Sequence, residues 1–66
     1  MELKDLRKSR GLTQEQLAHI VGLKKNTICS YEKKKRKPDL LNAIKISHAL
    51  NVDLQTIAEI FSFEEK

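Results

Sequence analysis

The fold of this 66-residue chain is decided by residues 13–32, which read Thr-Gln-Glu-Gln-Leu-Ala-His-Ile-Val-Gly-Leu-Lys-Lys-Asn-Thr-Ile-Cys-Ser-Tyr-Glu. Thr13, followed three residues later by Gln16, forms a capping box, in which each side chain accepts the other residue's backbone N–H at the start of a helix. Gly22 can take a positive φ in a turn without a steric penalty. The stretch therefore predicts a helix over about residues 14–21, a tight turn at 22–24 and a second helix from 25 to 32 or 33.

Small and apolar side chains are expected to set the angle between these two helices. Ala18 allows the second helix to cross closely over the first, and Ile28 is placed to point back into the angle between them. Together with Gly22 in the turn, these residues make the sequence pattern of a helix-turn-helix, whose second helix enters the major groove of DNA.

A further helix is predicted before this motif, over residues 2–10. Leu3 and Leu6 form an apolar edge and basic residues form another, while Gly11 stands where a glycine commonly ends a helix.

Two more helices are predicted after the motif. Residues 39–50 follow Asp39 as N-cap and end at Asn51, and Asp53 begins a fifth helix that runs to about Phe61. With no strand pattern, the predicted class is all-α with five helices. The inward faces are expected to consist of Leu17, Ala18, Val21, Ile28, Tyr31, Leu40, Ala43, Ile46 or Ser47, Leu50, Leu54, Ile57, Ala58 and Phe61.

Charge is distributed unevenly along the chain. Residues 1–37 carry eleven Lys/Arg and four Asp/Glu, a net charge of +7, whereas residues 38–66 carry two Lys/Arg and five Asp/Glu, a net charge of −3. The basic half contains the predicted motif, and a one-sided positive field suits a polyanion such as DNA. A solvated surface that keeps a small protein soluble accounts for the charge equally well.

Composition argues against several other functional classes. Cys29 is the only cysteine, so no disulfide can form within the chain, and a reducing, cytoplasmic setting is the simplest interpretation. The spacings of His19, Cys29 and His48 match no compact zinc site. No apolar run is long enough to span a membrane. We therefore expect no enzyme activity, no metal or other cofactor, no small-molecule ligand and no membrane association.

The second helix of the motif carries a polar and basic face that could contact DNA bases. Asn26 can form a bidentate pair with an adenine edge, Lys25 can reach guanine O6 or N7, and Ser30 is adaptable. No acidic residue occurs on this helix before Glu32, although solvent-facing helices usually mix both signs. An ordinary polar face is the alternative interpretation.

A run of five basic residues follows, Lys33-Lys34-Lys35-Arg36-Lys37, and ends at Pro38. Like charges in a row repel one another and Pro38 disfavours helix before it, so the run predicts a basic loop. Its place directly after a helix-turn-helix indicates contact with the DNA backbone.

The pattern Thr13-Gln14-Glu15-x-Leu17-Ala18, followed by Gly22, resembles the Cro/cI-type (XRE-like) helix-turn-helix regulators of phages and bacteria. The likeness covers about residues 3–61 and also includes Leu6-Arg7, Gly11-Leu12, Thr27-Ile28, Tyr31-Glu32, Lys35-Arg36-x-Pro38 and Ala49-Leu50-Asn51-Val52. It implies a single compact five-helix, lambda-repressor-like domain over residues 1–66, with the helix-turn-helix at 13–33. It also implies that the chain binds double-stranded DNA as a homodimer on a palindromic operator, most simply as a repressor.

By position, the resemblance implies specific roles for residues in and around the motif. Lys25, Asn26 and Ser30 match base-reading positions, Gln14 matches a base or phosphate contact, and Arg7 and Glu32 match a structural ion pair. Phosphate contacts are expected from Lys24, Thr27, Lys33, Lys35, Arg36 and Lys37.

The sequence departs from the family pattern at two positions. Lys24 stands where the family usually has a Ser or Thr N-cap, and Lys34 stands where it usually has a glycine. Lysine cannot cap a helix, and lysine in the left-handed region costs roughly 1 kcal/mol. Our hypothesis is that both lysines raise non-specific DNA affinity at some cost in stability.

Because the chain ends soon after the fifth helix, we expect dimer contacts at Ile57, Ile60, Phe61 and Phe63. A different interpretation makes the same fold an antitoxin or adaptor, in which the Phe61/Phe63 surface binds another protein. A restriction–modification controller differs from the leading interpretation only in its genomic context.

Overall fold

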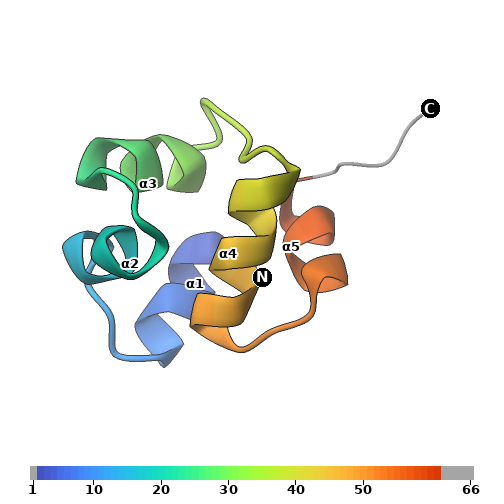
Figure 1. Ribbon diagram of the computed structural model, residues 1–66, viewed down its shortest axis with the longest axis horizontal. Coiled ribbons are helices and arrows are strands. Elements are labelled where there is room, and N and C mark those ends of the chain that lie inside the picture. The colour runs from blue at the N-terminus through green and yellow to red at the C-terminus, as the bar shows by residue number, and fades with distance from the viewer. Residues whose placement is uncertain (1, 62–66) are drawn as a thin grey trace.

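The computed structural model describes residues 2–61, which form five helices and no strand (Figure 1). The predicted all-α, five-helix class is confirmed. Every helix lies within one or two residues of its predicted position, and their bounds are α1 Leu3–Ser9, α2 Gln14–Val21, α3 Lys25–Glu32, α4 Leu40–Leu50 and α5 Leu54–Phe61.

The helix ends follow from local chemistry. Thr13 Oγ1 accepts the backbone N–H of Gln16 at 3.0 Å, and Gln16 Oε1 accepts that of Thr13 at 2.9 Å, which completes the capping box of α2. Gly22 closes α2 with φ 74°. Asp39 Oδ1 accepts the N–H of Asn42 at 2.8 Å at the start of α4, and Asn51 ends that helix with φ 57°.

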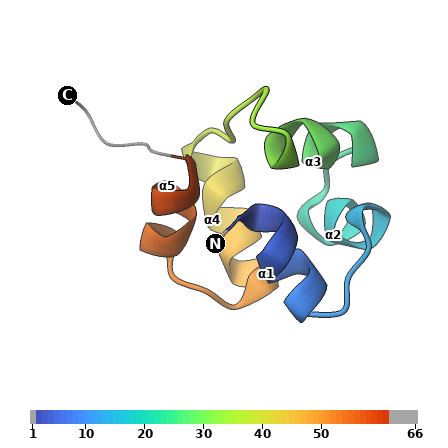
Figure 2. The same cartoon turned by 180° about the vertical axis from the view of Figure 1, so that it is seen from behind.

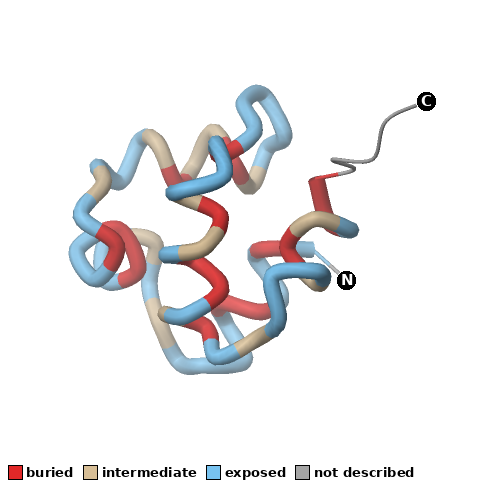
Figure 3. Tube along the Cα trace, turned by 45° about the vertical axis from the view of Figure 1, so that its right-hand side comes forward, coloured by how far each residue is buried: buried red, intermediate tan, exposed pale blue. Residues whose placement is uncertain are grey.

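The helices surround one hydrophobic core, with α2 and α3 side by side at one end, α4 in the middle and α5 at the opposite end (Figure 1). The reverse view shows α1 on the other side of α4 (Figure 2). The buried stretches of the helices face inward, whereas most of the segment between α3 and α4 is exposed (Figure 3).

Two leucines predicted to lie in the core are exposed. Leu40 is 66% exposed and Leu54 is 37% exposed. Each is the first residue of its helix, where the apolar stripe extends past the neighbouring helices that could cover it. Ile60, which was not assigned to the inward face, is 7% exposed and takes a place in the core.

The residues predicted to contact a second copy lie inside the chain's own core. Ile57, Ile60 and Phe61 are 0%, 7% and 3% exposed, because the apolar stripe of α5 packs against α4. This corrects the expectation that they form a dimer surface. Phe63 lies outside the described residues.

Lys34 has the left-handed backbone conformation predicted for it, with φ 61°. Its ammonium Nζ lies 2.9 Å from Glu2 Oε1, and both side chains are about half exposed. This ion pair links the start of α1 to the segment after α3, and no sequence pattern indicated it.

We expect Lys34→Gly to raise the melting temperature by a few degrees. Glycine removes a left-handed penalty of roughly 1–2 kcal/mol, whereas a half-exposed ion pair stabilises by only about 0–1 kcal/mol. For a chain of this size, 1 kcal/mol corresponds to a shift of roughly 4–8 °C. Thermal unfolding followed by circular dichroism measures the change.

Lys34→Gln is the matched control, because it removes the ion pair with Glu2 and keeps a non-glycine residue at the left-handed position. It should lower the melting temperature slightly or not at all. A fall in melting temperature for Lys34→Gly would mean that the ion pair outweighs the backbone strain.

Candidate nucleic-acid interface

Helix α3 buries one face and exposes its N-terminal end. Ile28 and Tyr31 are 0% and 2% exposed and hold the helix on the core. Lys25 and Asn26 are exposed, and Ser30, one turn later, is half-buried. The three residues predicted to read bases are therefore all on α3 and outside the core.

The first turn of α3 has no side-chain cap. Lys24 occupies the N-cap position with φ −91° and ψ 153°, and its side chain accepts no backbone N–H. The first N–H groups of a helix have no acceptor within the helix. The N–H of Thr27 donates to the carbonyl oxygen of Lys24 at 3.0 Å, so the N–H groups of Lys25 and Asn26 are the ones that face an anion. Lys24 is exposed beside them, and Thr27 is half-buried one turn further.

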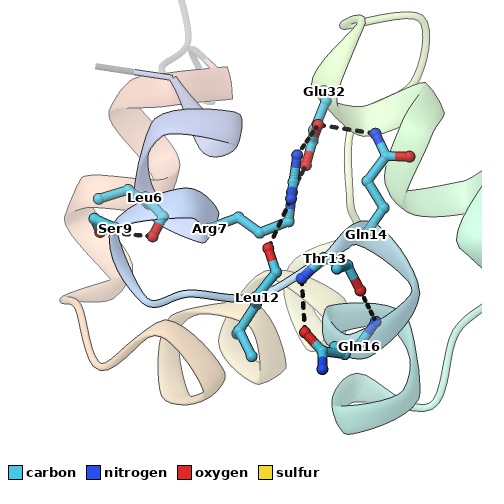
Figure 4. A network of polar contacts seen from close by, with 8 residues as sticks. All are labelled: Leu6, Arg7, Ser9, Leu12, Thr13, Gln14, Gln16 and Glu32. Carbon is cyan, nitrogen blue, oxygen red and sulfur yellow. Dashed lines mark hydrogen bonds and ion pairs between the residues drawn. The ribbon is translucent and has the colours of Figure 1, made fainter.

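The C-terminal end of α3 is held to α1 by a buried ion pair (Figure 4). Arg7 Nε donates to Glu32 Oε2 at 2.6 Å and Arg7 Nη2 donates to Oε1 at 3.3 Å, which is a bidentate arrangement. The side chains are 8% and 5% exposed. Arg7 Nη1 also donates to the carbonyl oxygen of Leu12 at 2.7 Å. The ion pair implied by the resemblance is thus present and serves the structure.

Gln14 joins the same network from the start of α2. Its Nε2 donates to Glu32 Oε1 at 3.0 Å (Figure 4). Because a carboxylate can only accept, the amide nitrogen must face Glu32 and the amide oxygen must face away. Gln14 is therefore an oriented side chain that presents a hydrogen-bond acceptor.

An open hollow of about 550 Å³ lies between the end of α1 and the starts of α2 and α3. Lys8, Thr13, Gln14 and Lys25 are among the residues that line it. The start of α2 therefore borders this hollow together with two lysines and the acidic Glu15, and the N–H of Gln16 in the same turn is already accepted by Thr13 Oγ1. The two lysines and the remaining N–H groups of that turn suit a phosphate group.

The basic segment after α3 supplies exposed positive charge next to the exposed face of α3. Residues 33–37 are all exposed, and Pro38 is fully buried and fixes the end of the segment. The ammonium of Lys34 is paired with Glu2. Lys33, Lys35, Arg36 and Lys37 have no ion pair among the interactions found for residues 2–61.

Arg10 has a structural role that the sequence pattern did not indicate. Its Nε donates to the carbonyl oxygen of Leu50 at 2.6 Å and its Nη2 donates to that of Asn51 at 3.5 Å. A guanidinium at the C-terminal end of a helix satisfies carbonyl groups and complements the helix dipole. Arg7 and Arg10 thus hold helices together, whereas the exposed positive charge around α3 comes from Lys24, Lys25 and the basic segment that contains Arg36.

Within the part of the chain that the structure describes, no group of His, Cys, Asp and Glu side chains could hold a metal ion. No helix in the same part is long and apolar enough to cross a membrane.

We expect Glu32→Gln to destabilise the protein by about 3–5 kcal/mol, because removing one partner of a buried ion pair leaves the other charge uncompensated. The substitution also removes the charged acceptor of Gln14. Urea denaturation measures the loss. Glu15→Gln, on the exposed side of α2, is the control and should change stability little. A loss of less than about 1 kcal/mol for Glu32→Gln would show that the ion pair does not hold α3 to α1.

Comparison with known proteins places this geometry in a family. A family model described as helix-turn-helix matches residues 3–57. A Methanothermobacter thermautotrophicus protein named as an uncharacterized HTH-type transcriptional regulator is 40% identical over 63 residues, which cover 96% of this chain and 88% of the relative. A protein of the same description from Archaeoglobus fulgidus is 38% identical over 64 residues, or 97% of this chain and 86% of the relative.

A third relative is the transcriptional repressor RstR of the cryptic phage CTXphi from Vibrio cholerae. It is 38% identical over 64 residues, which cover 97% of this chain and 55% of RstR. No solved structure matched the chain. The family model and these relatives show that the chain belongs to the Cro/cI-type (XRE-type) helix-turn-helix family of transcriptional regulators.

Proposed function

We propose that this protein is a sequence-specific double-stranded DNA-binding repressor that acts as a homodimer on a palindromic operator. In this proposal α3 enters the major groove at each half-site, and the two half-sites lie about one DNA turn apart. It has no enzymatic step, because occupancy of the operator alone blocks RNA polymerase. The RstR relative, which is named as a phage repressor, supports repression as the mode of regulation.

The observation that carries the proposal is that the start of α3 is exposed and free of acidic residues, while the opposite face of the helix is packed on the core. Lys25, Asn26 and Ser30 project from a helix whose opposite face is buried through Ile28 and Tyr31. Residues at the N-terminal end of a recognition helix contact base edges. Asn26 is assigned to an adenine edge and Lys25 to a guanine edge.

Gln14 is proposed to read a base amino group. Its amide nitrogen is used by Glu32, so the oxygen that faces outward accepts from adenine N6 or cytosine N4. The same oxygen would repel a phosphate. The phosphate contact near this position is therefore assigned to the N–H groups in the first turn of α2, with Lys8 and Lys25 beside the same hollow.

Sequence-independent affinity is proposed to come from the exposed basic residues around α3. These residues are Lys24, Lys33, Lys35, Arg36 and Lys37, with the hydroxyl of Thr27 as a further phosphate contact. Each neutralised phosphate releases counterions, so binding should weaken steeply as salt rises. Lys34 contributes less, because Glu2 holds its ammonium.

An antitoxin or adaptor role is less well supported. It placed a partner protein on a surface formed by Phe61 and Phe63, and Phe61 is 3% exposed and packs edge-on against Tyr31. The described part of that surface is thus inside the protein.

Selection of bound duplexes from a random DNA pool at two salt concentrations tests the proposal. We expect a palindromic consensus and a slope of log affinity against log salt of about −0.9 per phosphate neutralised. Absence of enrichment over random sequence would contradict sequence-specific binding.

Two substitutions separate base contacts from phosphate contacts on the selected duplex. Asn26→Ala should relax the sequence requirement at one base pair per half-site and cost roughly 1–3 kcal/mol on the consensus. Arg36→Ala, in the exposed basic segment, should weaken binding to all duplexes alike. Equal loss on consensus and scrambled duplexes for Asn26→Ala would remove it from base recognition.

A further inference from the structure

Lys34 occupies the position that closes α3, and its backbone is fixed there. Its N–H donates to the carbonyl oxygen of Tyr31 at 3.0 Å, and the N–H of Lys35 donates to that of Ser30 at 2.9 Å. Together with φ 61° at Lys34, these two bonds form a Schellman motif, in which the left-handed residue is usually glycine. The chain therefore carries a cationic side chain at this point despite a conformational cost.

Glu2, the acid that pairs with Lys34, also projects from a fixed backbone. Its N–H donates to Asp5 Oδ2 at 2.9 Å, and its carbonyl oxygen accepts the N–H groups of Asp5 and Leu6 at 3.0 and 3.2 Å. Leu3, the next residue, is 1% exposed and anchors α1 in the core. Two fixed segments of the chain thus bring the carboxylate and the ammonium together, and Lys34 Nζ lies 2.9 Å from Glu2 Oε1.

This ion pair is exposed enough to be exchanged for a pair with a DNA phosphate. The side chains of Lys34 and Glu2 are 48% and 54% exposed, and exposed ion pairs hold their partners weakly. A lysine ammonium is a compact charge that binds carboxylate and phosphate oxygens alike. The Glu2 carboxylate therefore fills the place on Lys34 that a phosphate oxygen would take. A phosphate that displaces it is left with a like charge close by, because the backbone of Glu2 is fixed.

Lys34 differs in this respect from the rest of the basic segment after α3. The other four basic side chains of the segment make no ion pair in the part of the chain that the structure describes, and they are Lys33, Lys35, Arg36 and Lys37. These four can contact phosphates without displacing a carboxylate. A phosphate contact from Lys34 has to be made at the expense of its pair with Glu2.

We propose that Glu2 competes with DNA phosphate for Lys34 and thereby lowers the affinity of this chain for DNA of every sequence. The inference rests on the proposed function, since it requires the basic segment to face the DNA backbone. It limits the hypothesis that Lys34 raises non-specific affinity, because the full gain appears only when the Glu2 carboxylate is removed. Phosphates are the same on every duplex and carry no sequence information, so the competition leaves the sequence preference unchanged.

A double-mutant cycle tests the competition on the selected palindrome and on a duplex of scrambled sequence. Glu2→Gln keeps the length of the side chain and removes its charge. We expect it to raise affinity for both duplexes roughly two- to fivefold per bound copy, which is the size of one exposed ion pair. The slope of log affinity against log salt should become steeper by about 0.9 per bound copy, because one more phosphate is neutralised.

The other two corners of the cycle show whether the gain passes through Lys34. Lys34→Gln alone should change the affinity by less than about twofold, because the ammonium that it removes is already paired. The double variant, with Glu2→Gln and Lys34→Gln together, should bind no more tightly than Lys34→Gln alone. The ratio of affinities for the two duplexes should be the same in all four proteins.

Glu59→Gln is the matched control, because it neutralises an exposed acid on α5, which lies at the opposite end of the molecule from α2 and α3 (Figure 1). It makes the same change in net charge and should leave DNA affinity unchanged, since salt screens distant charges. An unchanged affinity in Glu2→Gln overturns the proposal, as does an equal gain in Glu59→Gln or a gain that persists in the Lys34→Gln background. Equal affinity of the wild type for both duplexes would instead refute the proposed function, and the competition would still be measured on the scrambled duplex.

Discussion

The buried ion pair between Arg7 and Glu32 is the constraint on which the rest of the structure depends. It joins α1, at the start of the chain, to the last residue of α3, and Gln14 brings the start of α2 to the same carboxylate. Three helices thus meet at one charged group in a chain with a small apolar core. Burying such a pair costs desolvation energy, which is offset only when nearly all of its hydrogen-bonding capacity is used. Here the guanidinium also donates to the carbonyl of Leu12, and no buried polar side-chain atom within residues 2–61 lacks a partner.

The remaining interactions divide the chain into a supporting frame and an exposed contact surface. Arg10 closes the end of α4, and Tyr31 joins α3 to α4 through Asn42 and to α5 through an edge-on ring contact with Phe61, with centroids 6.2 Å apart. These groups are unavailable to a ligand. The solvent-facing positive charge is carried instead by Lys24, Lys25 and the segment after α3.

Local signals in the sequence were sufficient to predict most of the fold. Thr13 with Gln16, Gly22 and Asp39 each determine a helix end through contacts within a few residues, so the helices and their caps could be placed. The apolar periodicity of a helix did not predict which of its side chains another helix would cover. The spacing that buries Ala43 and Leu50 extends back to Leu40, but no helix covers that position. Likewise, the apolar stripe on α5 did not show that it packs against α4 of the same chain and not against a second copy. The pair of Lys34 with Glu2 joins residues far apart in sequence, and no pattern encodes it.

The way α3 is held has a consequence for how such a protein can acquire a new target. The helix is anchored at Glu32 and Tyr31, near its C-terminal end, and by Ile28 on its inner side. Within residues 2–61, its outward side chains at positions 25, 26 and 30 make no hydrogen bond or ion pair that holds the helix in place. Exchanging those outward side chains leaves every anchor in place. Under the proposed function, changes in sequence preference and changes in folding stability are therefore separable in this chain, because the side chains assigned to bases are not those that anchor the helix. The start of the helix, by contrast, has no side-chain cap, so its first turn is held by fewer interactions than its C-terminal end.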